Sequence, residues 1–319
     1  MATPLVVETP VIRRQTQAGD IVARWVVTVF AASILFVTAL LVYQLWTGSA
    51  PSRLKSGFGF LTSTQWNPVT EEFGALPFIY GTVLTSVLAL LISVPLGLGA
   101  AIYLAELAPA RLSDALTFLV ELLAAIPSVI YGVLAIFAVV PLMRSHVEPF
   151  LKSSLGFLPL FKGPSLGVGF LTAGVVLSIM TVPYIVSVSR ESLLAVPREQ
   201  REAALALGAT RWEMVWQVVV PYAKLGIFGS IFLSLARALG ETMAVTMVIG
   251  NDPKIRASLL APGYSIAAVI ANEFSEATGA TYQAALVELG LILFVLTIII
   301  NAVARLMIAA TTRKGSKRS

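Results

Sequence analysis

Cysteine is absent from this chain, histidine occurs once, and charged residues make up only 12% of the sequence. The absence of cysteine excludes disulfides, iron–sulfur clusters and thiol-ligated metals. We expect no metal site around the single histidine, His146. A soluble domain contains about 25% charged residues. The shortage of charge therefore argues against a water-soluble protein.

Apolar residues fill 57% of the chain, compared with about 45–50% in soluble domains. They form six runs, each longer than the ~20 residues with which a helix crosses ~30 Å of hydrocarbon. Continuous runs of this length indicate helices rather than barrel strands. We therefore predict an all-α integral membrane protein with six transmembrane helices. The predicted spans are Trp25–Trp46, Phe78–Ala105, Leu116–Met143, Leu166–Ser189, Leu225–Ile249 and Ala284–Ala310.

The first run is about twice as long as the apolar part of a secretory signal, so we expect a retained anchor rather than a cleaved peptide. Lysine and arginine gather on one side of the predicted spans, which includes both ends of the chain and the Arg190–Lys224 loop. The positive-inside rule makes that side cytoplasmic. The expected organisation is a polar tail at 1–23, a six-helix domain at 24–310 and a basic tail at 311–319.

The loop between the fourth and fifth spans contains PREQREAALALGATRWEMVWQVVVP, residues 197–221. Good helix formers follow Pro197, and Gly208 supplies a left-handed stop after the last turn. Thr210-Arg-Trp-Glu213 matches a capping box, so a second helix starts at once. Pro221 ends or kinks that helix before the fifth span. The pattern predicts a helix–turn–helix hairpin outside the membrane.

One face of this hairpin is small or apolar, because Ala203, Ala204 and Leu207 share it. Another protein can approach such a face closely, as in helix-in-groove docking. The alternative is that the hairpin packs only on its own membrane domain. Glu199, Glu202 and Glu213 offset the basic residues, so we do not expect nucleic acid as a partner.

An arginine and a glutamate interrupt the fifth run. Ser230, Ser234, Arg237 and Glu241 are spaced 4, 3 and 4, which places them within about 60° on one face of a helix. An arginine at the bilayer centre costs at least ~2.5–3.5 kcal/mol, whereas a local pair with Glu241 returns only ~0.2–0.5 kcal/mol. Something facing the stripe must compensate: a water-filled path, a partner helix or a passing anion. Our hypothesis is that Arg237 and Glu241 line a translocation path, and the alternative is a structural ion pair between helices.

Two further features accompany the stripe. Gly226 extends it with open space, and the PSVIYG segment at 127–132 offers a kink at which the helix backbone opens. Ser128 and Tyr131 in that segment are additional candidate path residues.

The segment REAALALGATRWEMVWQVVVP resembles the loop motif of binding-protein-dependent ABC importer permeases, which has Glu-Ala-Ala, a later Gly and a distant Pro. Glu202, Ala203, Ala204 and Gly208 match the motif, while Val220-Pro221 stands where Leu-Pro is usual. In that family the loop forms coupling helices that sit in a cleft of a separate cytoplasmic ATPase. The resemblance implies that Glu202, Ala203, Ala204, Leu207 and Gly208 couple this chain to such an ATPase.

Four other segments are similar to permease subunits of phosphate-specific ABC importers. They are WNPVTEEFGALPFIYGT (66–82), IPSVIYGV (126–133), TVPYIVSVSRESLLAVP (181–197) and ARALGETMAVTMVIGN (236–251). The resemblance implies a type I (MetI-like) importer fold in a bacterial plasma membrane. It also implies a second related permease subunit, two ATPase subunits and an external phosphate-binding protein as partners.

The chain has no GxxxxGK[ST] phosphate loop, so we expect ATP and Mg²⁺ to bind to a partner and this chain to be no enzyme. Three alternatives stay open. The first is a permease for another oxyanion, such as molybdate or sulfate. The second is a secondary transporter in which Arg237 and Glu241 form an ion-coupled gate. The third is a membrane scaffold without transport.

Overall fold

The computed structural model of the protein describes residues 17–316, with side chains for 19–306. These residues form two units that are described separately: helix α1 (Gln17–Gly48) up to Thr47, and the chain from Gly48 onward. Within the described residues, six helices are long and apolar enough to cross a membrane. This confirms the predicted fold class. The six are Gly19–Gly48, Leu76–Leu107, Ser128–Leu155, Phe170–Leu194, Arg211–Gly240 and Ala280–Leu306.

The second unit is mainly helical and contains one small hairpin of strands. Its strands β1 (Trp66–Asn67) and β2 (Glu72–Phe73) pair antiparallel, with Trp66 opposite Phe73. Its α-helices are α2 (Ala50–Ser56), α3 (Gly59–Thr62), α4 (Leu76–Ile102), α5 (Ala110–Ala125), α6 (Ser128–Leu134), α7 (Val140–Leu142), α8 (Glu148–Leu155), α9 (Phe170–Leu194), α10 (Arg198–Ala206), α11 (Arg211–Met214), α12 (Val220–Gly240), α13 (Met243–Val248), α14 (Ile266–Glu273) and α15 (Ala280–Ser316). π-Helical turns η1 (Tyr103–Leu107), η2 (Ala135–Val139), η3 (Met143–Val147) and η5 (Val215–Val219) continue several of these helices, and η4 (Pro159–Phe161) is a 3₁₀ turn.

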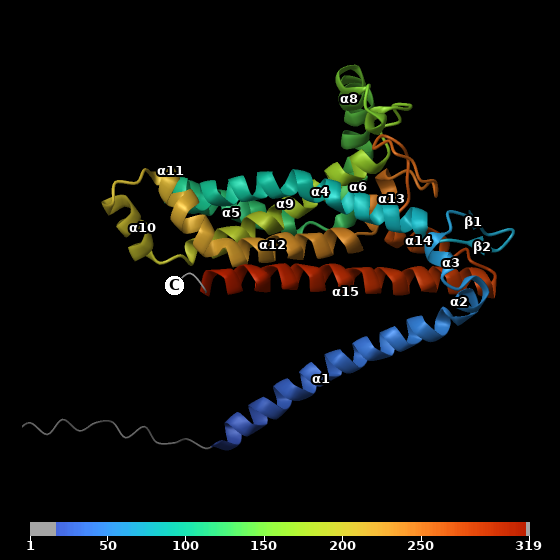
Figure 1. Ribbon diagram of the computed structural model, residues 1–319, viewed down its shortest axis with the longest axis horizontal. Coiled ribbons are helices and arrows are strands. Elements are labelled where there is room, and N and C mark those ends of the chain that lie inside the picture. The colour runs from blue at the N-terminus through green and yellow to red at the C-terminus, as the bar shows by residue number, and fades with distance from the viewer. Residues whose placement is uncertain (1–16, 317–319) are drawn as a thin grey trace, which may run out of the picture. The chain divides into compact units, whose positions relative to one another are not determined.

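The long helices of this unit lie roughly parallel, with α10 and α11 at one end and the strands at the other (Figure 1). Helix α9 packs against α4, α5 and α12. Glycines bring α4 and α9 close together: a Cβ at Gly97 would lie 2.7 Å from Ile185 Cγ2, and one at Gly174 would lie 2.7 Å from Leu88 Cβ. Small residues at helix contacts allow this approach where no hydrophobic effect drives helices together in lipid.

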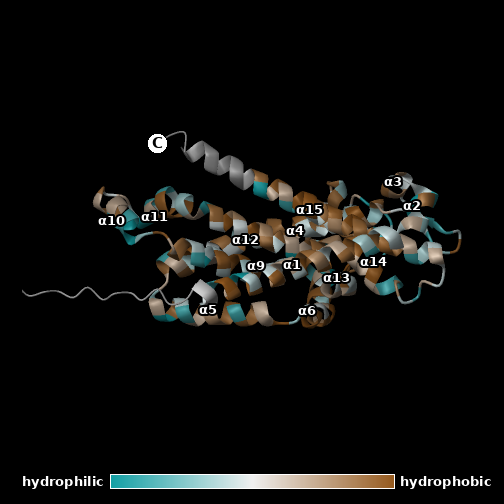
Figure 2. Cartoon of the chain, turned by 90° about the horizontal axis from the view of Figure 1, so that it is seen from below, coloured by the Kyte–Doolittle hydropathy of each residue, from teal (hydrophilic) through white to brown (hydrophobic). Residues whose placement is uncertain are grey.

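The exterior of the long helices is apolar, whereas hydrophilic residues gather around α10 (Figure 2). Leu91, Phe137 and Leu233 are all more than half exposed. Exposed apolar surface of this extent indicates contact with lipid or protein rather than water. The interior divides into three clusters, of which the one nearest α10 joins the end of α4 to α9, η5 and α12.

The third predicted span needs correction, because the chain breaks at Ile126 and Pro127. Both residues are extended, with ψ of 129° and 139°. Proline removes a backbone donor and disfavours the helical conformation of the residue before it. Residues 110–125 therefore form the separate helix α5, and the spanning helix runs over Ser128–Leu155 instead of Leu116–Met143.

The fifth predicted span is also interrupted. Helix α12 ends at Gly240, Glu241 is extended, and α13 begins only at Met243. Arg237 consequently lies in the last turn of α12 rather than at the middle of one long helix. At the other end, Pro221 does not end the second hairpin helix, because η5 carries the helix from α11 into α12.

Candidate functional site

The Arg237 side chain packs on an aromatic ring. Its guanidinium carbon lies 4.4 Å from the centroid of the Tyr184 ring on α9. This is a cation–π contact, which strengthens when the pair is removed from water. The Nε atom of Arg237 is buried and has no hydrogen-bond partner. Among the described residues no carboxylate forms an ion pair with this guanidinium, and no hydrogen-bond acceptor is found for its Nε.

Glu241 is not the partner that the spacing suggested. It lies beyond the end of α12, and its Oε1 accepts a hydrogen bond from the Ala244 amide at 3.4 Å, in the first turn of α13. The prediction of a four-residue helical stripe is therefore wrong for Glu241. Only Ser230, Ser234 and Arg237 share a helix, and the local Arg237–Glu241 pair is not formed.

The two serines of the stripe lie within the protein interior. Ser230 is fully buried; its Oγ lies 2.8 Å from Ser189 Oγ of α9 and 2.8 Å from the Ile227 carbonyl. Ser234 is also fully buried, and its Oγ has no partner. The expected open space at Gly226 is wrong, because a Cβ there would lie 2.5 Å from Ser192 Cβ. This face of α12 is therefore packed against α9.

Two tyrosines donate hydrogen bonds to the C-terminal carbonyls of α5. The Tyr131 hydroxyl donates to the Leu123 carbonyl at 2.7 Å, and the Tyr184 hydroxyl donates to the Ala124 carbonyl at 2.9 Å. The last carbonyls of a helix lack partners inside the helix. The two hydroxyls bind neighbouring carbonyls of α5, and Arg237 packs on the Tyr184 ring. We call these three residues the arginine–tyrosine cluster.

The negative end of the α5 dipole therefore lies beside the arginine–tyrosine cluster. Cations such as the Arg237 guanidinium are stabilised at helix C-termini. Ser128 begins α6 directly after the break and is half-buried. The structure accordingly gathers Arg237, Tyr131 and the start of α6 near one helix break. Ser230 lies earlier in α12, where that helix packs against α9.

The predicted hairpin forms with the expected local chemistry. Gly208 follows α10 with φ of +89°, a conformation that glycine adopts without strain. The capping box is present: the Glu213 amide donates to Thr210 Oγ1 at 3.3 Å, and the Thr210 amide donates to Glu213 Oε2 at 2.8 Å. Both bonds fix where α11 starts, so the hairpin geometry is locally encoded.

The hairpin encloses a shallow hollow of about 540 Å³. Ala203 and Leu207 are exposed on it, Leu207 by 89%, while Ala204 also packs against the cluster beneath the hairpin. Glu202 is exposed but does not line the hollow. The lining residues are Gln200, Ala203, Ala204, Leu207, Gly208, Ala209, Glu213, Met214, Gln217 and Val218. Of the apolar face that the sequence predicted, the described residues thus leave Ala203 and Leu207 free.

Sequence reasoning missed the aromatic partner of Arg237. Tyr184 comes from a different span, and no local spacing relates the two residues. The available signal was general: a tyrosine in an apolar helix needs a partner for its hydroxyl.

Residues 93–313 match the family described as binding-protein-dependent transport system inner membrane component. The chain belongs to this family. Similar proteins named phosphate transport system permease protein PstC include one from Xylella fastidiosa strain Temecula1, which is 48% identical over 89% of both chains. Another, from Mesorhizobium japonicum, is 49% identical over 88% of both chains. A third, from Pasteurella multocida, is 44% identical over 96% of this chain and 100% of its own length.

Solved structures of ABC transporters share the fold. A chain of a bacterial alginate ABC transporter, solved with an alginate-bound periplasmic protein, matches with a TM-score of 0.60 at 18% identity, over 91% of this chain and 96% of its own. A chain of the inward-facing MetNI methionine transporter matches with a TM-score of 0.54 at 19% identity, over 77% and 99%. At these identities the likeness establishes the type I permease architecture.

Proposed function

We propose that this chain is the membrane permease subunit of an ATP-driven importer of inorganic phosphate. The observation that carries the proposal is the 44–49% identity, over nearly the whole chain, to proteins named as phosphate transport permeases. No feature of the site favours an ion-coupled carrier, because the proposed gate pair Arg237–Glu241 is not formed. A scaffold without transport does not account for unpaired N–H donors on a membrane arginine.

Arg237 suits a weak anion site on the path. A guanidinium donates two parallel hydrogen bonds to phosphate oxygens and keeps its charge at every physiological pH. Tyr184 holds the cation through its ring face without using its N–H groups. A carboxylate partner would have occupied those groups and competed with the substrate. A weak site of this kind releases phosphate again, which transport requires.

The remaining proposed path residues differ in how they reach the substrate. Tyr131 and Ser128 lie at the break before α6, and Glu241 lies at the break before α13. Ser230 is covered by its contact with α9, and Ser234 on the same helix is fully buried. They become accessible only if α12 and α9 separate during the cycle, so we assign them to a later stage of the path.

The energy for this movement would come from a separate ATPase that binds ATP and Mg²⁺. The hairpin hollow, with Leu207 and Ala203 exposed on it, is the proposed docking surface. We further propose a complex of this chain with a second related permease, two ATPase subunits and an external phosphate-binding protein. The hairpin and both chain ends would face the cytoplasm of a bacterial plasma membrane.

Uptake of radiolabelled phosphate by the reconstituted complex tests the proposal. We expect uptake to require ATP and the binding protein, to be inhibited by arsenate, and to be insensitive to sulfate and molybdate. Uptake that follows an ion gradient without the ATPase would refute the assignment. Stronger inhibition by molybdate or sulfate than by arsenate would point instead to another oxyanion.

Arg237→Met tests the path. It removes the donors and the charge but keeps an apolar chain of similar length, so we expect an assembled complex with strongly reduced uptake. Normal uptake together with normal assembly would show that Arg237 is not part of the path.

A further inference from the structure

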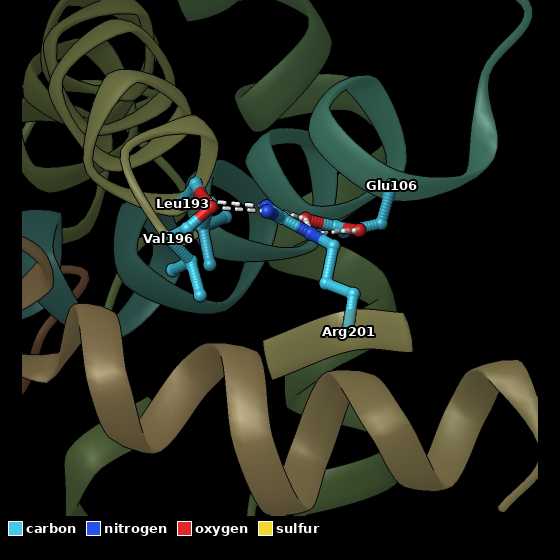
Figure 3. Close-up of polar contacts among 4 residues, drawn as sticks. All are labelled: Glu106, Leu193, Val196 and Arg201. Atoms are coloured by element: carbon cyan, nitrogen blue, oxygen red, sulfur yellow. Dashed lines mark hydrogen bonds and ion pairs between the residues drawn. The ribbon is translucent and has the colours of Figure 1, made fainter. Parts of the chain in front are cut away.

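A second arginine, Arg201 of the coupling helix α10, makes a dense set of contacts inside the permease (Figure 3). Its Nη2 lies 2.7 Å from Glu106 Oε1, and its Nε lies 3.2 Å from both oxygens of the same carboxylate. Nη2 also donates to the Leu193 carbonyl at 2.8 Å, and Nη1 donates to the Val196 carbonyl. One guanidinium therefore uses all three of its nitrogens on protein acceptors.

These acceptors belong to two different spans. Glu106 lies in η1, the π-helical end of the span that begins with α4. Leu193 lies in the last turn of α9, and Val196 lies two residues beyond the end of that helix. Carbonyls at a helix end have no partners within the helix, and basic side chains commonly bind them. Arg201 thus caps α9 and holds η1 at the same time.

The contact is shielded from water. The Arg201 and Glu106 side chains are only 17% and 6% exposed. Arg201 is not among the residues that line the hairpin hollow. At about 100° per residue, Arg201 lies roughly 100° around α10 from Gln200, which lines the hollow. Ala204, which also lines the hollow, lies nearer to Gln200 than to Arg201. The residue that binds the permease and the face that would bind the ATPase are therefore separate parts of α10.

A second layer of bonds extends the same assembly to α5. Arg190 of α9 donates to Ser113 Oγ at 3.1 Å, and Ser113 Oγ donates to the Leu104 carbonyl of η1 at 2.8 Å. Arg190 also lies 3.9 Å from Asp114. The ends of α9, η1 and α5 are thus joined to one another, and Arg201 attaches α10 to this joined end.

We propose that Arg201 is a positioning residue that makes α10, η1 and the end of α9 move as one body during transport. The inference rests on the proposed function, because it assigns the route by which movement of a docked ATPase reaches two spans. A guanidinium is needed for this role, because its planar fork reaches a carboxylate and two carbonyls together. A lysine ammonium, a single point charge on one nitrogen, does not.

The double substitution Arg201→Met/Glu106→Met separates positioning from simple stability. Replacing a buried ion pair by apolar residues of similar volume is often neutral or stabilising, whereas removing one partner leaves a buried charge. We therefore expect the double variant to fold and to co-purify with the ATPase. Arg201→Lys is the conservative companion, and Arg111→Met on the exposed start of α5 is the matched arginine control.

The first measurement is phosphate imported per ATP hydrolysed in proteoliposomes. We expect the double variant and Arg201→Lys to lower this ratio by roughly 5- to 150-fold, the range of a typical coupling between two sites. Arg111→Met should keep the parental ratio. A parental ratio in a stably assembled double variant would overturn the proposal, because the ion pair would then serve structure alone.

The second measurement uses the absence of natural cysteine. Spin labels at Glu199→Cys on α10 and Tyr103→Cys on η1, both exposed positions, report the distance between the two elements. We expect the same distance in resting and vanadate-trapped complexes with Arg201, and a state-dependent distance in the double variant. A distance that changes while Arg201 is present would refute the single-body movement. If the parental complex fails to import phosphate but the distances behave as expected, the proposed substrate fails and the positioning role stands.

Discussion

Replacing Tyr184 separates the two interactions that its side chain makes. Its ring face lies under the Arg237 guanidinium, and its hydroxyl donates to the Ala124 carbonyl at the end of α5. Tyr184→Phe removes only the hydroxyl, so Arg237 keeps its ring. Tyr184→Leu removes the ring as well, and with it the cation–π contact of the guanidinium.

The loss of the hydrogen bond affects stability, whereas the loss of the cation–π contact affects the position of Arg237. A lost hydrogen bond to a backbone carbonyl costs about 0.5–1.5 kcal/mol of stability, and this applies to both variants. The cation–π contact is worth about 0.5–2 kcal/mol in a site withdrawn from water. Since each 1.4 kcal/mol is a factor of ten, losing it reduces the population with Arg237 in position by about 2- to 30-fold. Only Tyr184→Leu suffers this second loss.

Initial rates of phosphate uptake, normalised to the amount of assembled complex, measure the difference. We expect Tyr184→Phe to transport nearly as fast as the parent and Tyr184→Leu to be slower by up to the factor above. Tyr222→Leu, at an exposed position of α12, controls for the loss of a tyrosine ring. Parental uptake by Tyr184→Leu would refute the reasoning, and so would an equal loss in both variants, since the hydroxyl would then matter and the ring would not.

Two further predictions concern the stability of particular contacts. Ser230→Ala leaves the buried Ser189 hydroxyl without its inter-helix partner, so we expect the free energy of unfolding in detergent to fall by about 1–3 kcal/mol. The double variant Ser189→Ala/Ser230→Ala should recover most of that loss. A double variant as unstable as the single one would contradict this. Gly208→Ala forces an L-residue into positive φ in open space, at a cost of about 1–2 kcal/mol. The α10 amides should therefore exchange with deuterium faster than in the parent, and the increase should be smaller in Gly208→Asn. Equal exchange in the parent and both variants would show that the turn is not strained.

The parts of the molecule that sequence predicted well are those encoded locally. Long apolar runs need no partner to indicate helices, and all six spans are present among the described residues. The hairpin is also local, because Gly208 and the Thr210–Glu213 box act within a few residues of each other. Such signals do not depend on which helices later become neighbours.

The parts that it predicted poorly depend on contacts between distant segments. Hydropathy did not reveal the end of α12 at Gly240, because the apolar run continues through α13. Arg237 was matched with its nearest acid, Glu241, whereas its actual partner is a tyrosine from another span. Glu106 and Arg201 are 95 residues apart, and neither position has a local pattern that relates it to the other. Buried polar residues in lipid find partners in space, and spacing along one helix does not identify them.

Helix α9 connects the two polar arrangements that these contacts create. It carries Tyr184 of the arginine–tyrosine cluster, and its last turn supplies the Leu193 carbonyl that Arg201 binds. Tyr184 and Leu193 are nine positions apart, which corresponds to about 13.5 Å along a helix axis. If Arg201 makes α10 and the end of α9 one body, a displacement of α10 relative to α11 moves the Tyr184 ring relative to Arg237, because η5 joins α11 to α12, the helix that carries Arg237. The same displacement shifts Ser189 against Ser230, so movement of α10 would change both the cation–π contact of Arg237 and the contact that covers Ser230.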